Sequence, residues 1–340
     1  MIGAGDLILG LETSCDDTCA AVVSGAGEVR SNVISSQGIH DAYGGVVPEI
    51  ASRHHLELVN AAVDDALRRA GATLGDIELV AVTQGPGLVG ALLVGVATAK
   101  AIAAARGLAL APVDHLQGHV AANFLREAGG AEVIMEPPFV CLLASGGHTL
   151  LASVEDHETF TVLGRTLDDA AGEAFDKGAR LLGLPFPGGP ALERLARDGD
   201  PEAFAFPVAR GVDGLDFSFA GVKTALLYRV RDLGEEGARE RRADLAASYQ
   251  HAIVTALAER CERALAERGG DRLAIGGGVA ANGPLRVRLA QLGVALGVPP
   301  RELCTDNAAM IASAARFVDA QPFPAYLAID AYASGERALA

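Results

Sequence analysis

Two histidines in the segment PVDHLQGHVAANF carry the clearest chemical signal in this chain. His115 and His119 are four residues apart, so a helix would place both imidazoles on one face, one turn apart. This spacing lets one rigid element supply two ligands to a divalent metal ion. Paired helical histidines also occur as hydrogen-bonded core residues, so the metal-site hypothesis requires a third ligand from elsewhere in the chain.

The third ligand that we expect is Asp306, which lies in CTDNAAMIASAARFV directly before an apolar pattern with helical period. Two histidines and one carboxylate form a site with open positions that suits Fe(II) or Zn(II). The alternative is that Thr305 or Asp306 only caps the following helix. His148 is a second candidate ligand, although its position at a turn also suits contact with a phosphate. The segment between the two histidines offers no glutamate, which disfavours a zinc protease of the HExxH type.

Two segments share one pattern, in which an apolar run, a short polar turn and a second apolar run follow one another. They are LILGLETSCDDTCAAVVSG (7–25) and FVCLLASGGHTLLASV (139–154), and each predicts a β-hairpin with an exposed polar tip. Alternating strand and helix patterns follow each of them. The repeated plan predicts two similar α/β lobes that face each other across a cleft.

The two polar tips differ in chemistry. The first contains the carboxylates Glu12 and Asp16, which could hold a metal or a water near phosphate oxygens. The second is Ser145-Gly146-Gly147-His148-Thr149, whose glycines would let the backbone approach a phosphate closely. Plain solvated turns are the alternative interpretation of both.

Two later segments add candidate binding groups. In the segment 167–196, Asp176 and Glu193 could accept hydrogen bonds from a hydroxyl-bearing group such as a ribose. The alternative is a helix with salt-bridged acids, because Asp168, Asp169 and Glu173 accompany Lys177 in the same helical pattern. The segment 273–292 predicts a strand, a glycine turn and a helix, an order that places backbone N–H groups where anions bind.

Composition limits the class of protein. The chain has 340 residues, half of them apolar, and a formal net charge of -15, so a nucleic-acid role needs a local basic patch or a partner. The charged segment 231–242 is expected to be an exposed connection between helices. The densest basic cluster is expected to be a solvated helix face, and it is also the patch that a nucleic acid could contact; it comprises Arg239, Arg241, Arg242, Arg260, Arg263, Arg268, Arg272, Arg286 and Arg288.

The chain is expected to be cytoplasmic and to have no membrane association. Its five cysteines show no CxxC spacing, which favours a reducing compartment. The N-terminus lacks the pattern of a signal peptide. The longest apolar run, 88–99, is too short to span a bilayer and predicts a buried helix.

Nine motifs together resemble one family, and they follow the family's order from about residue 8 to 316. They are ETSCDDT, GGVVPEIASRHH, QGPGLVGALLVG, PVDHLQGHV, LLASGGHT, DDAAGEAFDKGARLLGLPFPGGP, DFSFAGVKT, GGGVAAN and CTDNAAMIA. The family is that of the tRNA N6-adenosine threonylcarbamoyltransferases. The resemblance implies an actin-like ATPase (ribonuclease H-like) fold of two similar lobes around a central cleft. We expect the lobes at 1–133 and 134–340, with the C-terminal helix packing back on the first.

The resemblance also implies the site. His115, His119 and Asp306 would bind one divalent metal per chain, Fe(II) with Zn(II) as the alternative. No residue is assigned as a nucleophile, and Glu12 and Asp16 are the candidates for a catalytic role. The substrate pocket would be lined by Leu143, Ala144, Ser145, Gly146, Gly147, Asp176, Gly189, Glu193 and Asn282.

The implied reaction moves the threonylcarbamoyl group of threonylcarbamoyl-AMP to N6 of adenosine 37 in tRNAs that read ANN codons, forming t6A. An adenine nucleotide could occupy the same site. The adenine amine is a poor nucleophile, so the reaction needs an activated carbonyl with AMP as leaving group. The implied partners are tRNA, an inactive paralogue in a heterodimer, a small ATPase subunit and an upstream synthase. The chain departs from the family at its end, where AIDAYASGERALA replaces a basic, aromatic tail.

Other functions of the same fold are the alternatives. An actin-like ATPase would share the two hairpin tips but would not need the two histidines and Asp306. A metal-dependent hydrolase would need a general base beside the histidines, which Leu116, Gln117 and Gly118 do not supply. An inactive paralogue that acts as a scaffold would have no use for the metal ligands.

Overall fold

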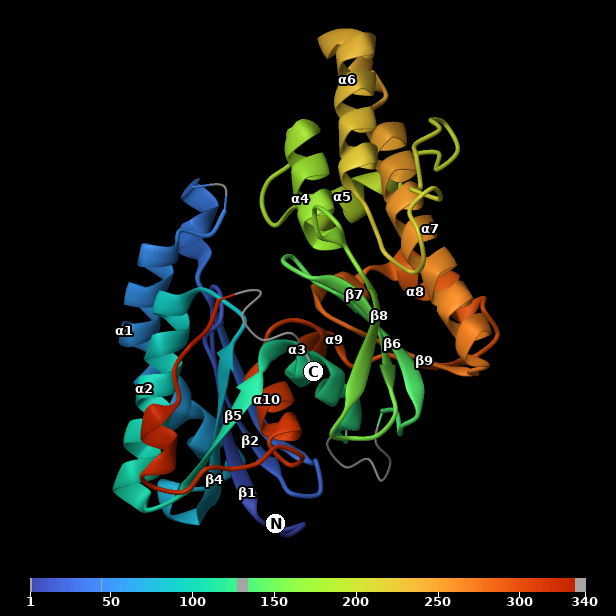
Figure 1. Ribbon diagram of the computed structural model, residues 1–340. Coiled ribbons are helices and arrows are strands. Elements are labelled where there is room, and N and C mark those ends of the chain that lie inside the picture. The colour runs from blue at the N-terminus through green and yellow to red at the C-terminus, as the bar shows by residue number, and fades with distance from the viewer. Residues whose placement is uncertain (1, 44, 127–133, 334–340) are drawn as a thin grey trace. The chain divides into compact units, whose positions relative to one another are not determined.

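The computed structural model describes residues 2–43, 45–126 and 134–333, which form two compact units (Figure 1). Unit 1 comprises Met1–Pro137, Asp156–Thr159 and Pro299–Ala340, and unit 2 comprises Pro138–Glu155 and Phe160–Val298. The expected boundary at residue 133 falls in 127–133, outside the described residues, as do residues 334–340 of the tail. The chain thus returns to unit 1 for its last part, which brings Asp306 into the same unit as the two histidines.

Unit 1 is built on a five-stranded sheet of order β3-β2-β1-β4-β5. Strands β1, β2 and β3 are antiparallel neighbours, whereas β4 pairs in parallel with both β1 and β5. The predicted first hairpin is confirmed as β1 and β2. The strand bounds are Leu7–Glu12 (β1), Asp17–Ser24 (β2), Val29–Ser36 (β3), Ile77–Gly85 (β4) and Ala109–Asp114 (β5).

Helices pack on both faces of this sheet (Figure 1). On one face, Leu9 and Leu11 of β1 share a core with buried residues of α1 and α2. On the other, Gly10 lies against α10, where a Cβ atom would come within 3.0 Å of Ala312. The helices are Pro48–Ala70 (α1), Val89–Arg106 (α2), His115–Ala121 (α3), Arg301–Cys304 (α9) and Ala308–Ala314 (α10).

Helix α2 matches the apolar run that predicted a buried helix. Its 18 residues are apolar enough to cross a membrane, but 39% of them are buried inside the protein. It packs against α1 and β4, and Ala91, Leu92 and Ala99 are fully buried. We therefore interpret it as a core helix of unit 1.

Unit 2 repeats the sheet of unit 1, with the order β10-β9-β6-β7-β8. Here β6, β7 and β8 are antiparallel neighbours, and β9 pairs in parallel with β6 and β10. The prediction of two similar α/β units is therefore confirmed. The strands are Phe139–Ala144 (β6), Thr149–Val154 (β7), Phe160–Arg165 (β8), Arg272–Gly276 (β9) and Ala295–Gly297 (β10).

The helices of unit 2 gather around α7, which packs on β6 and β9. The buried Tyr249 of α7 donates its hydroxyl to the carbonyl of Ala174 at 2.8 Å, and its ring fills the space beside Gly178. This contact fixes α4 on α7. The helices are Ala171–Leu181 (α4), Gly188–Ala196 (α5), Ala220–Glu240 (α6), Arg242–Arg268 (α7) and Gly283–Ala290 (α8).

Two expectations about unit 2 were wrong. The segment 231–242 is mostly exposed, as expected, but it is not a loop, because it is helical except at Gly234 (φ 70°), where α6 is kinked, and at Arg241, which separates α6 from α7. Arg260 is not on a solvated face either. Its guanidinium is buried and donates to the carbonyls of Ala209 and Asp216, which holds the preceding loop on α7.

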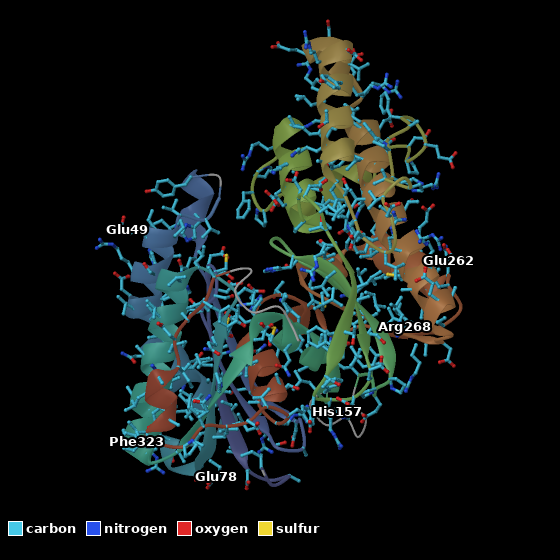
Figure 2. The ribbon with its side chains drawn as sticks, in the orientation of Figure 1. Glu49, Glu78, His157, Glu262, Arg268 and Phe323 are labelled. Carbon is cyan, nitrogen blue, oxygen red and sulfur yellow. The ribbon has the colours of Figure 1, made fainter. Side chains whose placement is uncertain are left out.

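The turn between β7 and β8 belongs to unit 1 because of one aromatic cluster. His157, labelled in Figure 2, stacks on Phe317 with ring centroids 4.7 Å apart and meets Phe124 edge-on. It also forms an ion pair with Glu136 at 3.1 Å. These contacts explain why Asp156–Thr159 is assigned to unit 1 although both flanking strands belong to unit 2.

We predict that Gly10→Ala lowers the free energy of unfolding by about 1–3 kcal/mol, because the new methyl group would overlap the carbonyl of Ala308 and push α10 off β1. Thermal and denaturant unfolding would measure it. The matched control is Gly38→Ala, since a Cβ there meets nothing within 4 Å. Equal stability of the two variants would show that α10 is not packed on β1 as described.

Candidate functional site

The two histidines lie on α3, which begins directly after strand β5. Asp114 caps the helix, because its Oδ1 accepts hydrogen bonds from the backbone N–H groups of Leu116 (2.8 Å) and Gln117 (3.2 Å). A polar residue at this position satisfies N–H groups that the first turn leaves unpaired. As the spacing predicted, His115 and His119 share one side of α3, and their ring centroids are 4.7 Å apart.

Asp306 reaches the histidines because α10 packs closely on α3. Gly118, on the turn between the histidines, leaves room for α10, since a Cβ there would lie 2.7 Å from Ile311. Helix α10 is capped at its N-terminus by Asn307, whose side chain accepts a hydrogen bond from the N–H of Met310 at 3.0 Å. The alternative that Thr305 or Asp306 is the cap is therefore wrong, and the carboxylate of Asp306 is available to the histidines.

These three side chains form a compact cluster of ligand atoms. Oδ1 of Asp306 lies 3.2 Å from Nε2 of His119 and 3.6 Å from Nε2 of His115. One ligand atom from each residue lies within 4.8 Å of the others. Among the described residues, neither ring nitrogen of the buried His119 forms a hydrogen bond, and Nε2 has only its ion-pair contact with Asp306. The donor set and this incompletely satisfied imidazole fit a divalent metal ion.

Glu12 fixes the orientation of His115. Its Oε2 lies 2.9 Å from Nδ1 of His115 and accepts a hydrogen bond from the hydroxyl of Thr83 at 2.6 Å. Its other oxygen accepts from the backbone N–H of Ser14. A carboxylate that holds Nδ1–H leaves Nε2 as the metal-binding atom and is typical of metal-bound histidines. The sequence suggested Glu12 as a candidate but gave no sign of this contact.

Charge and burial act together on the Glu12–His115 pair. Burial lowers the pKa of His115, but the negative charges of Asp306 and Glu12 outweigh it and raise the pKa to about 9. Burial raises the pKa of Glu12, but the charge and hydrogen bond of His115 bring it below its usual value. A cation therefore competes with a proton for His115 below about pH 9, and metal binding should weaken as the pH falls.

The first hairpin tip is buried rather than exposed, which corrects the expectation from sequence. Glu12, Thr13 and Ser14 are each at most 3% exposed, and they contact β4, α3 and the start of α2. His55 of α1 lies inside the tip, where its ring contacts the hydroxyl of Thr18 at 2.8 Å and the carbonyl of Cys15 at 3.0 Å. Sequence analysis missed His55, because a histidine inside an ordinary amphipathic helix gives no signal.

The two cysteines of this tip are not activated nucleophiles. Asp16 is half-buried, and its backbone carbonyl accepts a hydrogen bond from Gln37 at 3.1 Å. Burial and nearby carboxylates raise the pKa values of the Cys15 and Cys19 thiols. A thiol that stays protonated is a poor nucleophile.

The glycine tip of unit 2 is exposed, as expected, and other glycines hold it. The N–H of Ser145 closes the turn by donating a hydrogen bond to the carbonyl of His148 at 2.8 Å. Gly172, at the start of α4, and Gly277, after β9, both approach the tip so closely that a Cβ on either would overlap its backbone. Leu143, Ala144, Gly146 and Gly147 complete the segment. Three short loops thus converge around the backbone of residues 143–147.

The other predicted substrate residues form two groups in unit 2. Asp176 of α4 accepts hydrogen bonds from the backbone of Gly188 (2.8 Å) and Gly189 at the start of α5. Glu193 of α5 accepts from the side chain of Asn282 at 3.2 Å, and Asn282 also caps α8 through the N–H of Leu285. Burial raises the pKa of Asp176.

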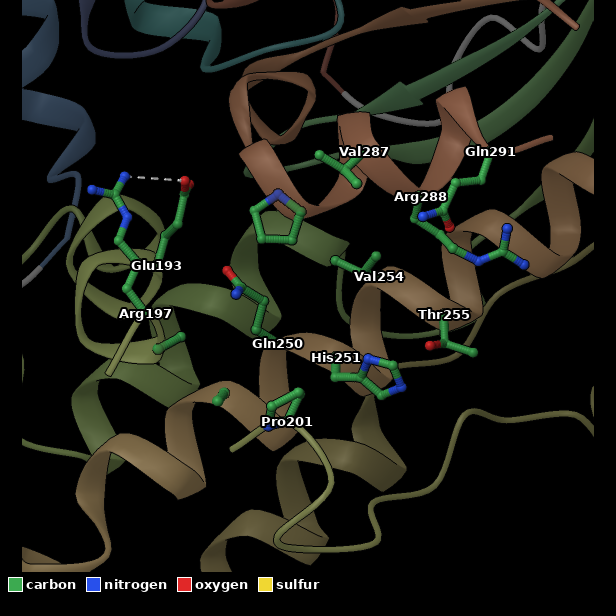
Figure 3. A pocket seen from close by; sticks show the side chains of 13 residues that line it. Glu193, Arg197, Pro201, Gln250, His251, Val254, Thr255, Val287, Arg288 and Gln291 are labelled. Atoms are coloured by element: carbon green, nitrogen blue, oxygen red, sulfur yellow. Dashed lines mark ion pairs between the residues drawn. The ribbon is translucent and has the colours of Figure 1, made fainter. Parts of the chain in front are cut away.

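A pocket of about 400 Å³ lies beside Glu193, between α5, α7 and α8 (Figure 3). Gln250 of α7, labelled in the figure, accepts a hydrogen bond from Asn282 at 2.9 Å and so links the pocket to the glycine turn after β9. Sequence analysis missed Gln250, which lies in a regular helix. The lining residues are Glu193, Ala196, Arg197, Pro201, Ala247, Gln250, His251, Val254, Thr255, Pro284, Val287, Arg288 and Gln291.

The fold is that of the actin-like ATPases. The chain is similar to the crystal structure of component A of (R)-2-hydroxyglutaryl-CoA dehydratase from Acidaminococcus fermentans, with a TM-score of 0.56, 15% identity, and coverage of 92% of this chain and 98% of that one. It is also similar to HypF of T. kodakarensis, with a TM-score of 0.59, 14% identity, and coverage of 92% and 47%. These likenesses confirm the expected fold class.

Residues 28–313 match the tRNA N6-adenosine threonylcarbamoyltransferase family. The chain is 53% identical over 317 residues to the tRNA N6-adenosine threonylcarbamoyltransferase of Symbiobacterium thermophilum, covering 92% of this chain and 91% of the relative. It is 50% identical over 317 residues to that of Clostridium perfringens, covering 92% of each. The chain therefore belongs to this family, as its motifs suggested. It is a transferase that forms t6A by transferring the threonylcarbamoyl group to N6 of adenosine in tRNA.

We predict that Asp306→Asn weakens binding of a divalent metal by more than about 100-fold, because it removes the charged ligand. Loss of a residue that is only hydrogen-bonded to a metal ligand already lowers metal affinity by about 10–100-fold. Metal content after reconstitution and dialysis, together with cobalt titration, would measure this. Asp198→Asn, at an exposed position of unit 2, is the matched control. A metal affinity equal to that of the control would remove Asp306 from the ligand set.

Glu12→Gln should weaken metal binding by about 10–100-fold without unfolding the protein, because a neutral amide cannot hold the His115 ring as a carboxylate does. The same cobalt titration measures the change, and circular dichroism checks the fold. Glu78→Gln, at an exposed position of β4, serves as the control. Unchanged affinity in the Glu12 variant would mean that the 2.9 Å contact has no role in orienting His115.

Proposed function

We propose that the chain catalyses threonylcarbamoyl transfer with one divalent metal, Fe(II) or alternatively Zn(II), held by His115, His119 and Asp306. The observation that carries the proposal is the approach of one oxygen of Asp306 to both imidazoles, at 3.2 and 3.6 Å. A metal bound there supplies Lewis-acid polarisation of a carbonyl and a positive charge that can orient the threonyl group. Glu12 holds His115 in the tautomer that this arrangement requires.

Unit 2 is proposed to bind the AMP half of threonylcarbamoyl-AMP. The exposed backbone of Ser145, Gly146 and Gly147 offers N–H groups to the phosphate, on which negative charge grows as AMP leaves. Asp176 and Glu193 are proposed to accept hydrogen bonds from the ribose, with Gly189 and Asn282 beside it. The pocket next to Glu193 combines apolar walls with the amide of Gln250, which suits an adenine base. ATP, ADP or AMP would bind the same groups.

The proposed reaction uses no covalent enzyme intermediate. The exocyclic amine of adenosine 37 attacks the carbamoyl carbon, a C–N bond forms, the bond from this carbon to the phosphate oxygen breaks, and N6 loses one proton. The role of the chain is to orient the donor, to stabilise charge on the leaving phosphate and to keep the carbonyl near the amine. Of the carboxylates in the metal-side tip, Glu12 and Asp16 are the candidates for a catalytic role, and Glu12 acts by positioning His115.

The partners and compartment are further parts of this proposal. We expect a heterodimer with an inactive paralogue, a small ATPase subunit and a separate synthase that supplies the donor, all in the cytoplasm. The net charge of -15 supports a need for partners in tRNA binding, because an acidic surface repels the phosphate backbone. The arginines at exposed positions of α6 and α7 are the groups by which this chain itself could contact tRNA.

Reconstitution with synthase, partner subunits, threonine, bicarbonate, ATP and tRNA should yield t6A, detected by nucleoside analysis. Glu193→Gln should raise the KM for threonylcarbamoyl-AMP by about tenfold with little change in kcat. The reason is that the variant loses a charged hydrogen-bond acceptor that contributes to binding this substrate and not to the chemical step. His119→Ala should instead abolish turnover in a folded protein. The control is Glu202→Gln, at an exposed position of the same unit. Full activity of His119→Ala would contradict the metal assignment.

A further inference from the structure

The last described part of the chain, residues 321–332, crosses unit 1 as a strap without regular strands. It begins beside the edge strand β5, where Gln321 and Leu110 exchange two backbone hydrogen bonds of 2.9 and 3.0 Å. Phe323, labelled in Figure 2, marks this end, and Figure 1 shows the strap (red) running alongside α2. Lys100 of α2 ties it down by donating to the carbonyls of Leu327 (2.9 Å) and Ile329 (2.5 Å).

The strap ends on the turn that follows β4. The side-chain amide of Gln84 donates to the carbonyl of Asp330 at 2.7 Å. The backbone carbonyl of Gln84 accepts a hydrogen bond from the N–H of Tyr332 at 3.2 Å. The Tyr332 ring covers Gly85, where a Cβ would lie 2.9 Å from the ring and overlap the Tyr332 carbonyl. A glycine at position 85 is therefore required for the ring to lie here. The position of Tyr332 is fixed by two hydrogen bonds of Gln84 and by this close contact.

From this position Tyr332 reaches the start of the metal-ligand helix. Its hydroxyl donates to Oδ2 of Asp114 at 2.5 Å, while Oδ1 of the same carboxylate caps α3. A hydrogen bond to a carboxylate is stronger than one between neutral groups and restricts the orientation of its acceptor. The two oxygens of Asp114 thus connect the end of the strap with the first turn of α3, directly before His115.

We propose that Tyr332 is a positioning residue of the metal centre, acting through Asp114 on the helix that carries both histidine ligands. Helix α3 has only seven residues, and a helix this short does not hold its position without external contacts. Metal sites tolerate ligand displacements of only about 0.5 Å. Loss of the phenol hydroxyl should therefore loosen α3 and weaken metal binding. The inference rests on the metal site proposed above.

Tyr332→Phe tests the proposal in the full-length chain, because the ring still covers Gly85 and only the hydroxyl is lost. We expect cobalt binding, followed by titration and by its visible spectrum, to weaken by about three- to tenfold. This is less than the 10–100-fold typical of a direct partner of a metal ligand. Tyr228→Phe, at a 56% exposed tyrosine of unit 2, is the matched control. Unfolding of the metal-free proteins should show nearly equal stability for the two variants.

A double-mutant cycle with Asp114→Asn identifies the route of the effect. If Tyr332 acts through Asp114, adding Tyr332→Phe to Asp114→Asn should weaken cobalt binding no further. Additive losses would overturn the proposal, as would wild-type cobalt affinity in Tyr332→Phe. If Asp306→Asn abolishes binding while Tyr332→Phe binds as the wild type does, only this inference fails. If the wild-type chain binds no cobalt at these residues, the metal centre fails and the inference fails with it.

Discussion

The metal cluster depends on the close approach of two short helices, α3 and α10. Their sequences are almost 200 residues apart, yet Gly118 and Gly10 leave the space that lets α10 lie against both α3 and β1. Only because α10 lies this close does Asp306, one residue before its cap, meet the imidazoles. The cap itself matters as well, since Asn307 satisfies the helix N-terminus and leaves the Asp306 carboxylate free of that role.

The site also depends on a buried negative charge, that of Glu12. Glu12 is fully buried, and an isolated carboxylate in such a place is strongly unfavourable. Three hydrogen bonds, from Ser14, Thr83 and His115, stabilise its charge, and this network holds the His115 ring. Among the described residues, Nδ1 of His119 has no hydrogen-bond partner and its Nε2 has only the Asp306 oxygen, 3.2 Å away. A cation would balance the two carboxylates and bind this ring at the same time.

The two units use one topology for different chemistry. Each sheet begins with a hairpin followed by parallel strands, in the same spatial order. In unit 1 the tip is buried, and its carboxylate supports a metal ligand. In unit 2 the equivalent tip has two glycines, stays exposed and offers backbone N–H groups. The same topology thus supplies two loop positions, and their side chains suit the cation and the phosphate that we propose for units 1 and 2.

The sequence alone predicted the two hairpins, the buried helix after residue 88 and the helical histidine pair, because hydrophobic periodicity and residue spacing are local properties. It also indicated the family through the joint occurrence of nine motifs, and Asp306 as a candidate metal ligand. Tertiary structure decided what no local pattern encodes: that the Glu12 tip is buried, that Asn307 rather than Asp306 caps α10, and that residues 231–242 are helical. The contacts of His55, Gln250 and Tyr332 likewise arise only when distant segments pack together, since no local spacing pattern points to them.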